Sequence, residues 1–179
     1  AWWGTLARPV FFVDHGRGED VGRATAGAHL RRGLGGHGHV LERREGKRVK
    51  EIFAQAGEDG FRAIETDVLR ELAGKEPLLV SCGGGVVKRD ENRAILRDAG
   101  FVVYLKVTAD EAKSRISDTS TRPLFQDLDA ARKTSEERLP LYADVADLTI
   151  DTAGKNVATI AREVQSALEK EGILCLQRK

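Results

Sequence analysis

The sequence predicts an α/β fold in which helices cover both faces of a parallel sheet. Short apolar or β-branched segments alternate with longer amphipathic segments along the chain, which is the pattern of such a sheet. No internal repeat, low-complexity tract or linker interrupts the 179 residues. We therefore expect residues 1–179 to form one domain.

Elements in the first half of the chain follow from apolar spacing and glycine stops. Residues 7–14 (ARPVFFVD) are short, apolar and bounded by Pro and Asp, which predicts a buried strand. Helices are expected at 23–32 and over 40–54, the second interrupted by a glycine. Residues 57–75 carry apolar side chains at helical spacing and end near a glycine, so an amphipathic helix is expected there. The apolar residues 77–81 form the next strand.

The second half continues the alternation. Residues 90–100 begin on an Asp cap and end on Gly, which predicts a helix. Residues 101–107 (FVVYLKV) have the aromatic and β-branched content of a buried strand. The capping box TADE at 108–111 opens a further helix. The remaining expected elements, in chain order, are a polar loop at 116–124, a helix up to about Arg138, a strand at 146–152 and a helix at 157–172.

Composition and charge exclude several classes of function. The chain carries 29 basic and 28 acidic residues, so no global field favours nucleic acid or a membrane surface. The basic run 43–50 is diluted by glutamates and is typical of a solvated helical face. No apolar run reaches the ~20 residues that span a bilayer, and no signal-peptide pattern opens the sequence. Two cysteines build no disulfide framework, which favours a cytoplasmic protein. From the charge balance and the apolar runs, we expect no nucleic-acid or membrane partner.

The stretch SCGGGVVKRD at 81–90 takes a strand directly into three glycines. Glycine is useful where a backbone bends sharply or approaches a ligand closely. In parallel sheets, ligands bind at the carboxyl ends of the strands. Two turns satisfy that geometry here, one after strand 7–14 and one after strand 77–81.

Three arginines have informative neighbours. Arg62 and Glu65 are three residues apart on an expected helix, so they share one face. Arg122 precedes a proline in the polar loop, and Arg138 precedes LPLY. Arginine clamps carboxylate or phosphate groups with a bidentate fork, although a single arginine is more often a surface charge. Cys82, beside the glycines, lacks a flanking His or helix start, so we interpret it as a packed residue rather than a nucleophile.

Four motifs in order, IFAQAGEDGFRAIE, SCGGGVV, TRPL and RLPLY, resemble the shikimate kinase family over about residues 40–152. The resemblance implies a monomeric P-loop nucleoside-phosphate kinase with a five-stranded parallel sheet. It also implies a substrate-binding region that includes 57–75 and a lid loop at 116–126. Members of the family transfer the γ-phosphoryl group of ATP to the 3-hydroxyl of shikimate with Mg²⁺.

The same resemblance implies roles for individual residues. Arg62 and Arg138 would grip the shikimate carboxylate, and Arg122 would close over the phosphates and neutralise charge during transfer. Arg115 would pack on adenine. The glycines implied are Gly83, Gly84 and Gly85 as the backbone lining of the shikimate pocket, and Gly16 and Gly18 as part of the phosphate loop.

The phosphate loop departs from the family pattern. G-x-x-x-x-G-K-[ST] is expected after the first strand, because its amides, Lys and hydroxyl hold the phosphates and Mg²⁺. The chain has FFVDHGRGEDVGR at 11–23, about two residues short of that pattern. Glu19 and Asp20 stand nearest the missing Lys and Ser/Thr, and carboxylates repel phosphate.

A second departure follows in GLGGHGHVLE. The family has Asp-x-Asp shortly before its match to VLE, with one Asp on substrate hydroxyls and the other near magnesium. Gly36 and Gly38 occupy those places in this chain. His37 and His39 lie beside them, and we expect both to be exposed loop residues.

Three interpretations stay open because these departures all lie within residues 1–39. The chain is a working kinase whose true first residues differ from the printed ones. Alternatively, it is a degenerate relative that binds a shikimate-like ligand or a partner without catalysis. Or it is a small-molecule kinase with a different phosphate loop.

Overall fold

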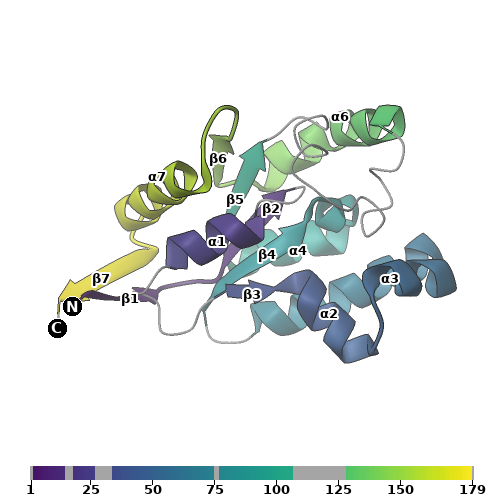
Figure 1. Ribbon diagram of the computed structural model, residues 1–179. Coiled ribbons are helices and arrows are strands. Elements are labelled where there is room, and N and C mark those ends of the chain that lie inside the picture. The colour runs from purple at the N-terminus through teal and green to yellow at the C-terminus, as the bar shows by residue number, and fades with distance from the viewer. Residues whose placement is uncertain (1, 15–17, 27–33, 75–76, 107–127, 179) are drawn as a thin grey trace.

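A parallel sheet forms the centre of the computed structural model, which describes all residues except 1, 15–17, 27–33, 75–76, 107–127 and 179 (Figure 1). Within the described residues the sheet has five strands in the order β3-β4-β2-β5-β6, and every neighbouring pair is parallel. The strands are β2 (Val10–Asp14), β3 (Leu34–Gly36), β4 (Leu79–Gly83), β5 (Phe101–Lys106) and β6 (Leu148–Asp151). The predicted α/β fold and the five parallel strands that the resemblance implied are confirmed.

Helices cover both faces of this sheet. They are α1 (Gly18–Ala26), α2 (His37–Glu45), α3 (Val49–Ala73), the 3₁₀ helix η1 (Gly84–Lys88), α4 (Asp90–Ala99), α6 (Leu128–Val145) and α7 (Val157–Lys170). Alternate side chains of β2 enter opposite cores, because successive strand residues face opposite ways. Phe11 joins the core with α3, α4 and α6. Phe12 joins the core with α1 and α7.

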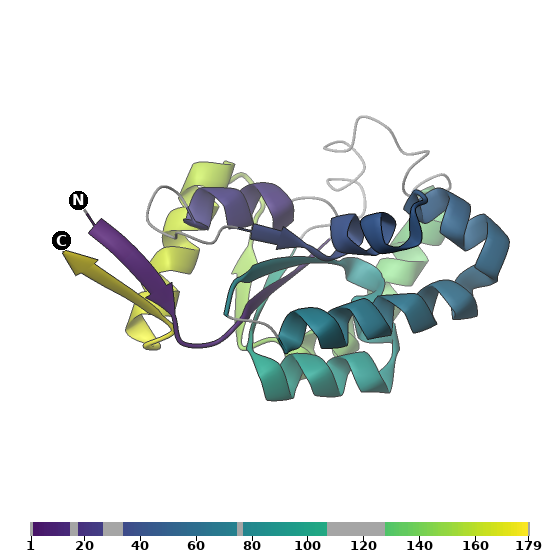
Figure 2. The same ribbon diagram turned by 90° about the horizontal axis from the view of Figure 1, so that it is seen from below.

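An antiparallel ribbon extends from the main body and was not predicted. β1 (Trp2–Leu6) pairs with β7 (Leu174–Arg178), so the two ends of the chain lie side by side (Figures 1 and 2). Leu174 is buried, and Leu6 and Leu176 pack against the core beneath α1 and α7. The ribbon is thereby attached to the domain through apolar contacts.

Two glycines shape the segment that carries Arg62. Gly46 separates α2 from α3 at φ 66°, as the expected interruption of helix 40–54 requires. Gly57 lies inside α3 at φ 69° and ψ −178°, so the helix stops and starts again there. Positive φ suits glycine and strains other residues. The second half of α3 therefore begins where a separate helix was expected at 57.

Several predicted boundaries are wrong. The helix expected to end near Arg138 continues to Val145 through Pro140, because Tyr142 and Val145 pack into the core beyond the proline. The helix expected at 23–32 begins at Gly18 instead. In the part of the chain that the structure describes, no helix combines the length and apolarity that a bilayer span requires.

The strand limits and the GLGGHGHVLE segment also differ from expectation. The expected strands at 7–14, 77–81, 101–107 and 146–152 are observed with ends shifted by one to three residues. His37 and His39 lie in the first turn of α2 rather than in a loop, while Gly36 ends β3. The expected capping box at 108–111 and lid at 116–126 lie outside the described residues.

Candidate acid-binding site at the glycine turn

The strand ends that precede the two turns singled out by the sequence lie next to each other in the sheet. β2 and β4 are parallel neighbours, and Asp14 pairs with Gly83 in their register. Gly83, Gly84 and Gly85, which we call the glycine turn, lead from β4 into η1. Two side chains of α4 hold η1 in place. Asn92 Nδ2 donates to the carbonyl of Val86 at 2.9 Å, and Arg93 Nη1 donates to that of Val87 at 2.6 Å. The backbone of η1 is therefore fixed rather than left to solvent.

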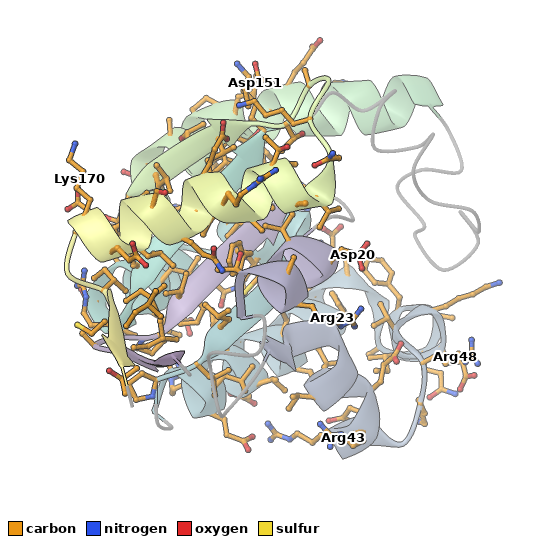
Figure 3. All side chains as sticks on the ribbon, turned by 60° about the vertical axis from the view of Figure 1, so that its left-hand side comes forward. Asp20, Arg23, Arg43, Arg48, Asp151 and Lys170 are labelled. Atoms are coloured by element: carbon orange, nitrogen blue, oxygen red, sulfur yellow. The ribbon has the colours of Figure 1, made fainter. Side chains whose placement is uncertain are left out.

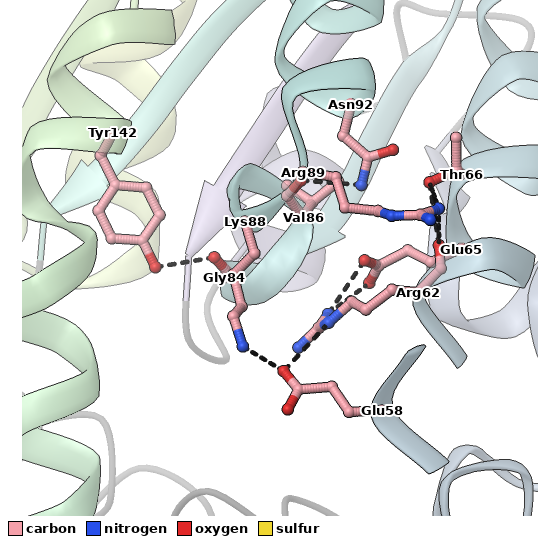
Figure 4. A network of polar contacts seen from close by, with 10 residues as sticks. All are labelled: Glu58, Arg62, Glu65, Thr66, Gly84, Val86, Lys88, Arg89, Asn92 and Tyr142. Atoms are coloured by element: carbon pink, nitrogen blue, oxygen red, sulfur yellow. Dashed lines mark hydrogen bonds and ion pairs between the residues drawn. The ribbon is translucent and has the colours of Figure 1, made fainter. Parts of the chain in front are cut away.

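Arg62 lies against this fixed backbone. Its side chain is buried, and Nη1 donates to both carboxylate oxygens of Glu65, at 3.0 and 3.1 Å. This pair confirms the expectation from their three-residue spacing. A Cβ on Gly85 would lie only 2.4 Å from Arg62 Nη2, so this glycine leaves the space that the guanidinium fills. Figure 4 shows Arg62 between Glu65 and Glu58.

Arg138 reaches the same region from α6 and is more deeply buried, with 3% of its surface exposed. Among the described residues, none provides a hydrogen-bond partner for its Nε, Nη1 or Nη2. One helical turn later, the Tyr142 hydroxyl donates to the Gly84 carbonyl at 2.8 Å (Figure 4). Residues four apart share a helix face, so the face of α6 with Arg138 is directed at the glycine turn.

Glu58 and Lys88 complete a cluster of charges around this turn. Lys88 Nζ hydrogen-bonds Glu58 Oε1, which also lies 3.8 Å from Arg62 Nε. The hydrogen bond from Lys88 lowers the pKa of Glu58; partial burial opposes this, and the charges of Arg62 and Arg138 lower it further. Both guanidinium groups therefore lie around one carboxylate. With Glu65 included, the cluster has three cations and two anions, a surplus of one positive charge.

This arrangement is suited to a ligand with a single carboxylate. A buried guanidinium without a partner is costly, whereas a bound carboxylate accepts its fork of parallel N–H groups. Arg138 is such a group. The surplus of one charge matches one carboxylate, and the side-chain-free turn at Gly84 and Gly85 leaves backbone available beside it.

The neighbouring end of β2 does not fit a nucleotide phosphate. α1 begins at Gly18, and Glu19 and Asp20 lie in its first turn, where a phosphate would meet the backbone amides. The Asp20 side chain is exposed and pairs with Arg23 at 3.6 Å; both residues are labelled in Figure 3. The Asp20 carboxylate in the first turn of α1 lies near the positive end of the helix dipole and repels a second anion.

Other predicted site residues have a mixed outcome. Gly16, Arg115 and Arg122 lie outside the described residues, so their roles stay predictions. Cys82 is buried, which agrees with its interpretation as a packed residue. Within the described ranges, no group of three or more His, Cys, Asp or Glu side chains forms a metal-binding cluster.

Sequence reasoning missed Glu58, Lys88 and Tyr142. Two of them had a detectable signal, because Glu58 lies four residues before Arg62 and Tyr142 four residues after Arg138, each on the same helical face. Lys88 had none, since it is thirty residues from Glu58 in sequence.

Comparisons with known proteins agree with this geometry. The family model described as shikimate kinase matches residues 20–169, beginning within α1. The chain is 40% identical over 162 residues to shikimate kinase of Paracidovorax citrulli, covering 85% of this chain and 88% of that protein. It is 42% identical over 128 residues to shikimate kinase of Geobacter metallireducens, covering 70% and 71%. The structure of shikimate kinase from Acinetobacter baumannii in complex with shikimate superposes with a TM-score of 0.86 at 30% identity, covering 92% and 94%.

The sheet order and this structural match define a P-loop type kinase fold for the chain. More narrowly, the chain belongs to the shikimate kinase family, a family of phosphotransferases.

Proposed function

We propose that this chain binds shikimate at the glycine turn and phosphorylates its 3-hydroxyl, with ATP as phosphoryl donor and Mg²⁺ as the metal. The observation that carries the proposal is the buried guanidinium of Arg138, which has no hydrogen-bond partner among the described residues. Its charge and that of Arg62 both act on Glu58, in a cluster with one surplus positive charge. Membership of a family of shikimate kinases supports the choice of acid and of reaction.

In this proposal the described residues bind and orient the acid. Arg62 and Arg138 hold the carboxylate, and Glu65 fixes the Arg62 guanidinium through its two hydrogen bonds. The backbone of Gly83, Gly84 and Gly85 lines the ring. Holding the acceptor in one orientation is a large part of phosphoryl-transfer catalysis, because little covalent chemistry is left to the protein.

ATP supplies the phosphoryl group, and Mg²⁺ neutralises charge on the phosphates. The carboxylate of Asp20 in the first turn of α1 disfavours a nucleotide phosphate at that position. We therefore assign no described residue to the transfer step. Arg122 in the lid and Arg115 beside adenine stay predictions from the family resemblance.

That misfit favours a second candidate function. A relative that keeps the acid site and binds shikimate, or a similar hydroxylated cyclic acid, without phosphoryl transfer would retain Arg62 and Arg138. It would tolerate Glu19 and Asp20, since nothing anionic approaches them. The two candidates share acid binding and differ only in turnover.

Two measurements on one purified sample separate the candidates. Calorimetry with shikimate tests the acid site, and coupled ADP release with shikimate and Mg²⁺ tests turnover. Binding with turnover supports the kinase, binding without turnover supports the second candidate, and absence of binding refutes both. Arg97→Ala serves as a control variant and should bind shikimate like the unmodified chain. It removes an exposed arginine of α4 that pairs with Asp144 outside the cluster. An intact mass of 19.6 kDa verifies the first residues of the sample.

We also propose that the chain acts as a single-domain, cytoplasmic monomer. Cys82 is buried and Cys175 is exposed, and they form no disulfide with each other, which agrees with a reducing compartment. Sedimentation of the purified chain at a mass near 19.6 kDa is the expected result, and a dimer mass would contradict it.

A further inference from the structure

We propose that Lys88 is a positioning residue that restricts Glu58 to a long ion pair with Arg62. The two arginines, Arg62 and Arg138, are thereby left able to hydrogen-bond the carboxylate of a bound acid. This inference rests on the proposed acid binding. It concerns a carboxylate that belongs to the chain itself and that would otherwise compete with the ligand.

Glu58 is placed to be such a competitor. The break at Gly57 restarts α3, so Glu58 lies in the first turn of the restarted helix and Arg62 follows one turn later. Residues four apart lie on one face, and Glu58 Oε1 is already 3.8 Å from Arg62 Nε. A small rotation of this half-exposed side chain is sufficient to convert that distance into a hydrogen bond. The ligand carboxylate needs the same nitrogen atoms.

The charge of Arg138 also attracts the Glu58 carboxylate. Its guanidinium is buried, and no described residue accepts a hydrogen bond from it. Glu58 already interacts with this charge, because Arg138 contributes to the lowering of the Glu58 pKa. A free carboxylate beside an unpartnered buried cation is attracted to it, since burial strengthens the interaction between opposite charges.

Lys88 provides the opposing contact. It is the last residue of η1, and its Nζ hydrogen-bonds the Glu58 oxygen that faces Arg62 (Figure 4). The hydrogen bond from Lys88 is also the largest cause of the lowered Glu58 pKa. The lysine therefore neutralises Glu58 and ties it to the glycine turn. Arg62 keeps its paired contact with Glu65, and none of the described residues takes up the hydrogen bonds of Arg138.

The test is a rescue experiment read by calorimetry of the full chain. Lys88→Met removes the ammonium group and keeps an apolar stem of similar length. We expect it to weaken shikimate binding about tenfold, because Glu58 then occupies the arginines. The double variant Lys88→Met with Glu58→Gln lacks the competing charge and should return to within about twofold of the unmodified chain. Lys155→Ala is the matched control, because it removes a similarly exposed ion pair between Lys155, which precedes α7, and Glu163 of α7.

A second ligand separates competition from distortion. Shikimate methyl ester has the same ring without the negative charge, so Glu58 does not compete with it for charge. Lys88→Met should leave ester binding, measured at high ligand concentration, within about twofold of the unmodified chain. Equal weakening of acid and ester would mean that the lysine acts through the shape of η1, which overturns the inference.

The remaining outcomes are also decisive. Unchanged acid affinity in Lys88→Met overturns the inference while leaving the proposed function intact. A double variant that binds no better than Lys88→Met overturns it as well. Absence of shikimate binding by the unmodified chain refutes the proposed function and the inference together. If Lys88→Met fails to fold, two other variants give the same decision. Lys88→Arg keeps the charge and should keep the affinity for shikimate. Glu58→Lys combined with Lys88→Glu reverses the pair and should weaken shikimate binding.

Discussion

Replacement of Arg138 by methionine should make the ligand-free protein more stable while it weakens acid binding. Methionine keeps a flexible apolar chain of similar reach but removes three buried nitrogen atoms that have no hydrogen-bond partner among the described residues. Replacing a residue of a binding site commonly relieves a cost that the fold bears for function. For Arg138 that cost has a visible source.

The magnitude follows from the burial of the guanidinium. Only 3% of Arg138 is exposed. Unsatisfied buried donors cost about 1–3 kcal/mol, and an unpaired buried charge costs more. Nearby Glu58 recovers part of this cost, since its charge interacts with Arg138. We therefore expect Arg138→Met to raise the free energy of unfolding by about 2 kcal/mol, or the melting temperature by about 4–8 °C.

The assay compares thermal unfolding with and without shikimate, and measures affinity by calorimetry. Loss of a charged hydrogen-bond partner should weaken shikimate about 10–150-fold. Shikimate at one fixed concentration should therefore stabilise the unmodified chain more than the variant. A variant that is less stable without ligand, or that still binds shikimate normally, would refute the reasoning that Arg138 waits for a carboxylate.

Three further predictions address the surroundings of this arginine. Gly85→Ala should weaken shikimate about tenfold in calorimetry, because its methyl group would lie 2.4 Å from Arg62 Nη2. Gly74→Ala is the control, because its Cβ would meet only ordinary contacts at 3.6 and 3.7 Å at the end of α3. Tyr142→Phe should lower the free energy of unfolding in urea by about 1 kcal/mol, since it removes one buried hydrogen bond to the glycine turn; an unchanged midpoint would contradict this. The pKa of Glu58 is lowered on folding, so it stabilises the protein above its unfolded pKa and this contribution disappears as pH falls through the acid range. Glu58→Gln should flatten that part of the stability profile, and an identical profile would show that the ion pair contributes nothing.

The core of the fold was predictable because its signals are local. Arg62 and Glu65 meet as their spacing requires, and α4 begins at Asp90 and ends at Ala99 before a glycine. The buried strands β2 and β5 are marked by apolar and β-branched runs. The register that sets Asp14 beside Gly83 follows from the rule that parallel strands end at one edge.

The missed elements depend on partners that are distant in sequence. β3 contains only Leu and two glycines, and it is a strand because β4 supplies its hydrogen bonds. β1 and β7 lie at opposite ends of the chain and define each other by pairing. α6 passes Pro140 because packing of Tyr142 outweighs the lost helical hydrogen bond. No local pattern contains these contacts.

The candidate site has two parts, one with buried charges and one with exposed charges. The proposed acid-binding part consists of α3, η1 and α6, where buried charges are placed by hydrogen bonds and by glycine geometry. The phosphate end depends on the first turn of α1, where exposed Asp20 pairs with Arg23. An unpaired buried arginine is unfavourable in a protein that has no use for it, because a neutral side chain at that position would be more stable. Retention of Arg138 in this state therefore favours a chain in which acid binding is under selection, whether or not residues 14–20 can hold a nucleotide.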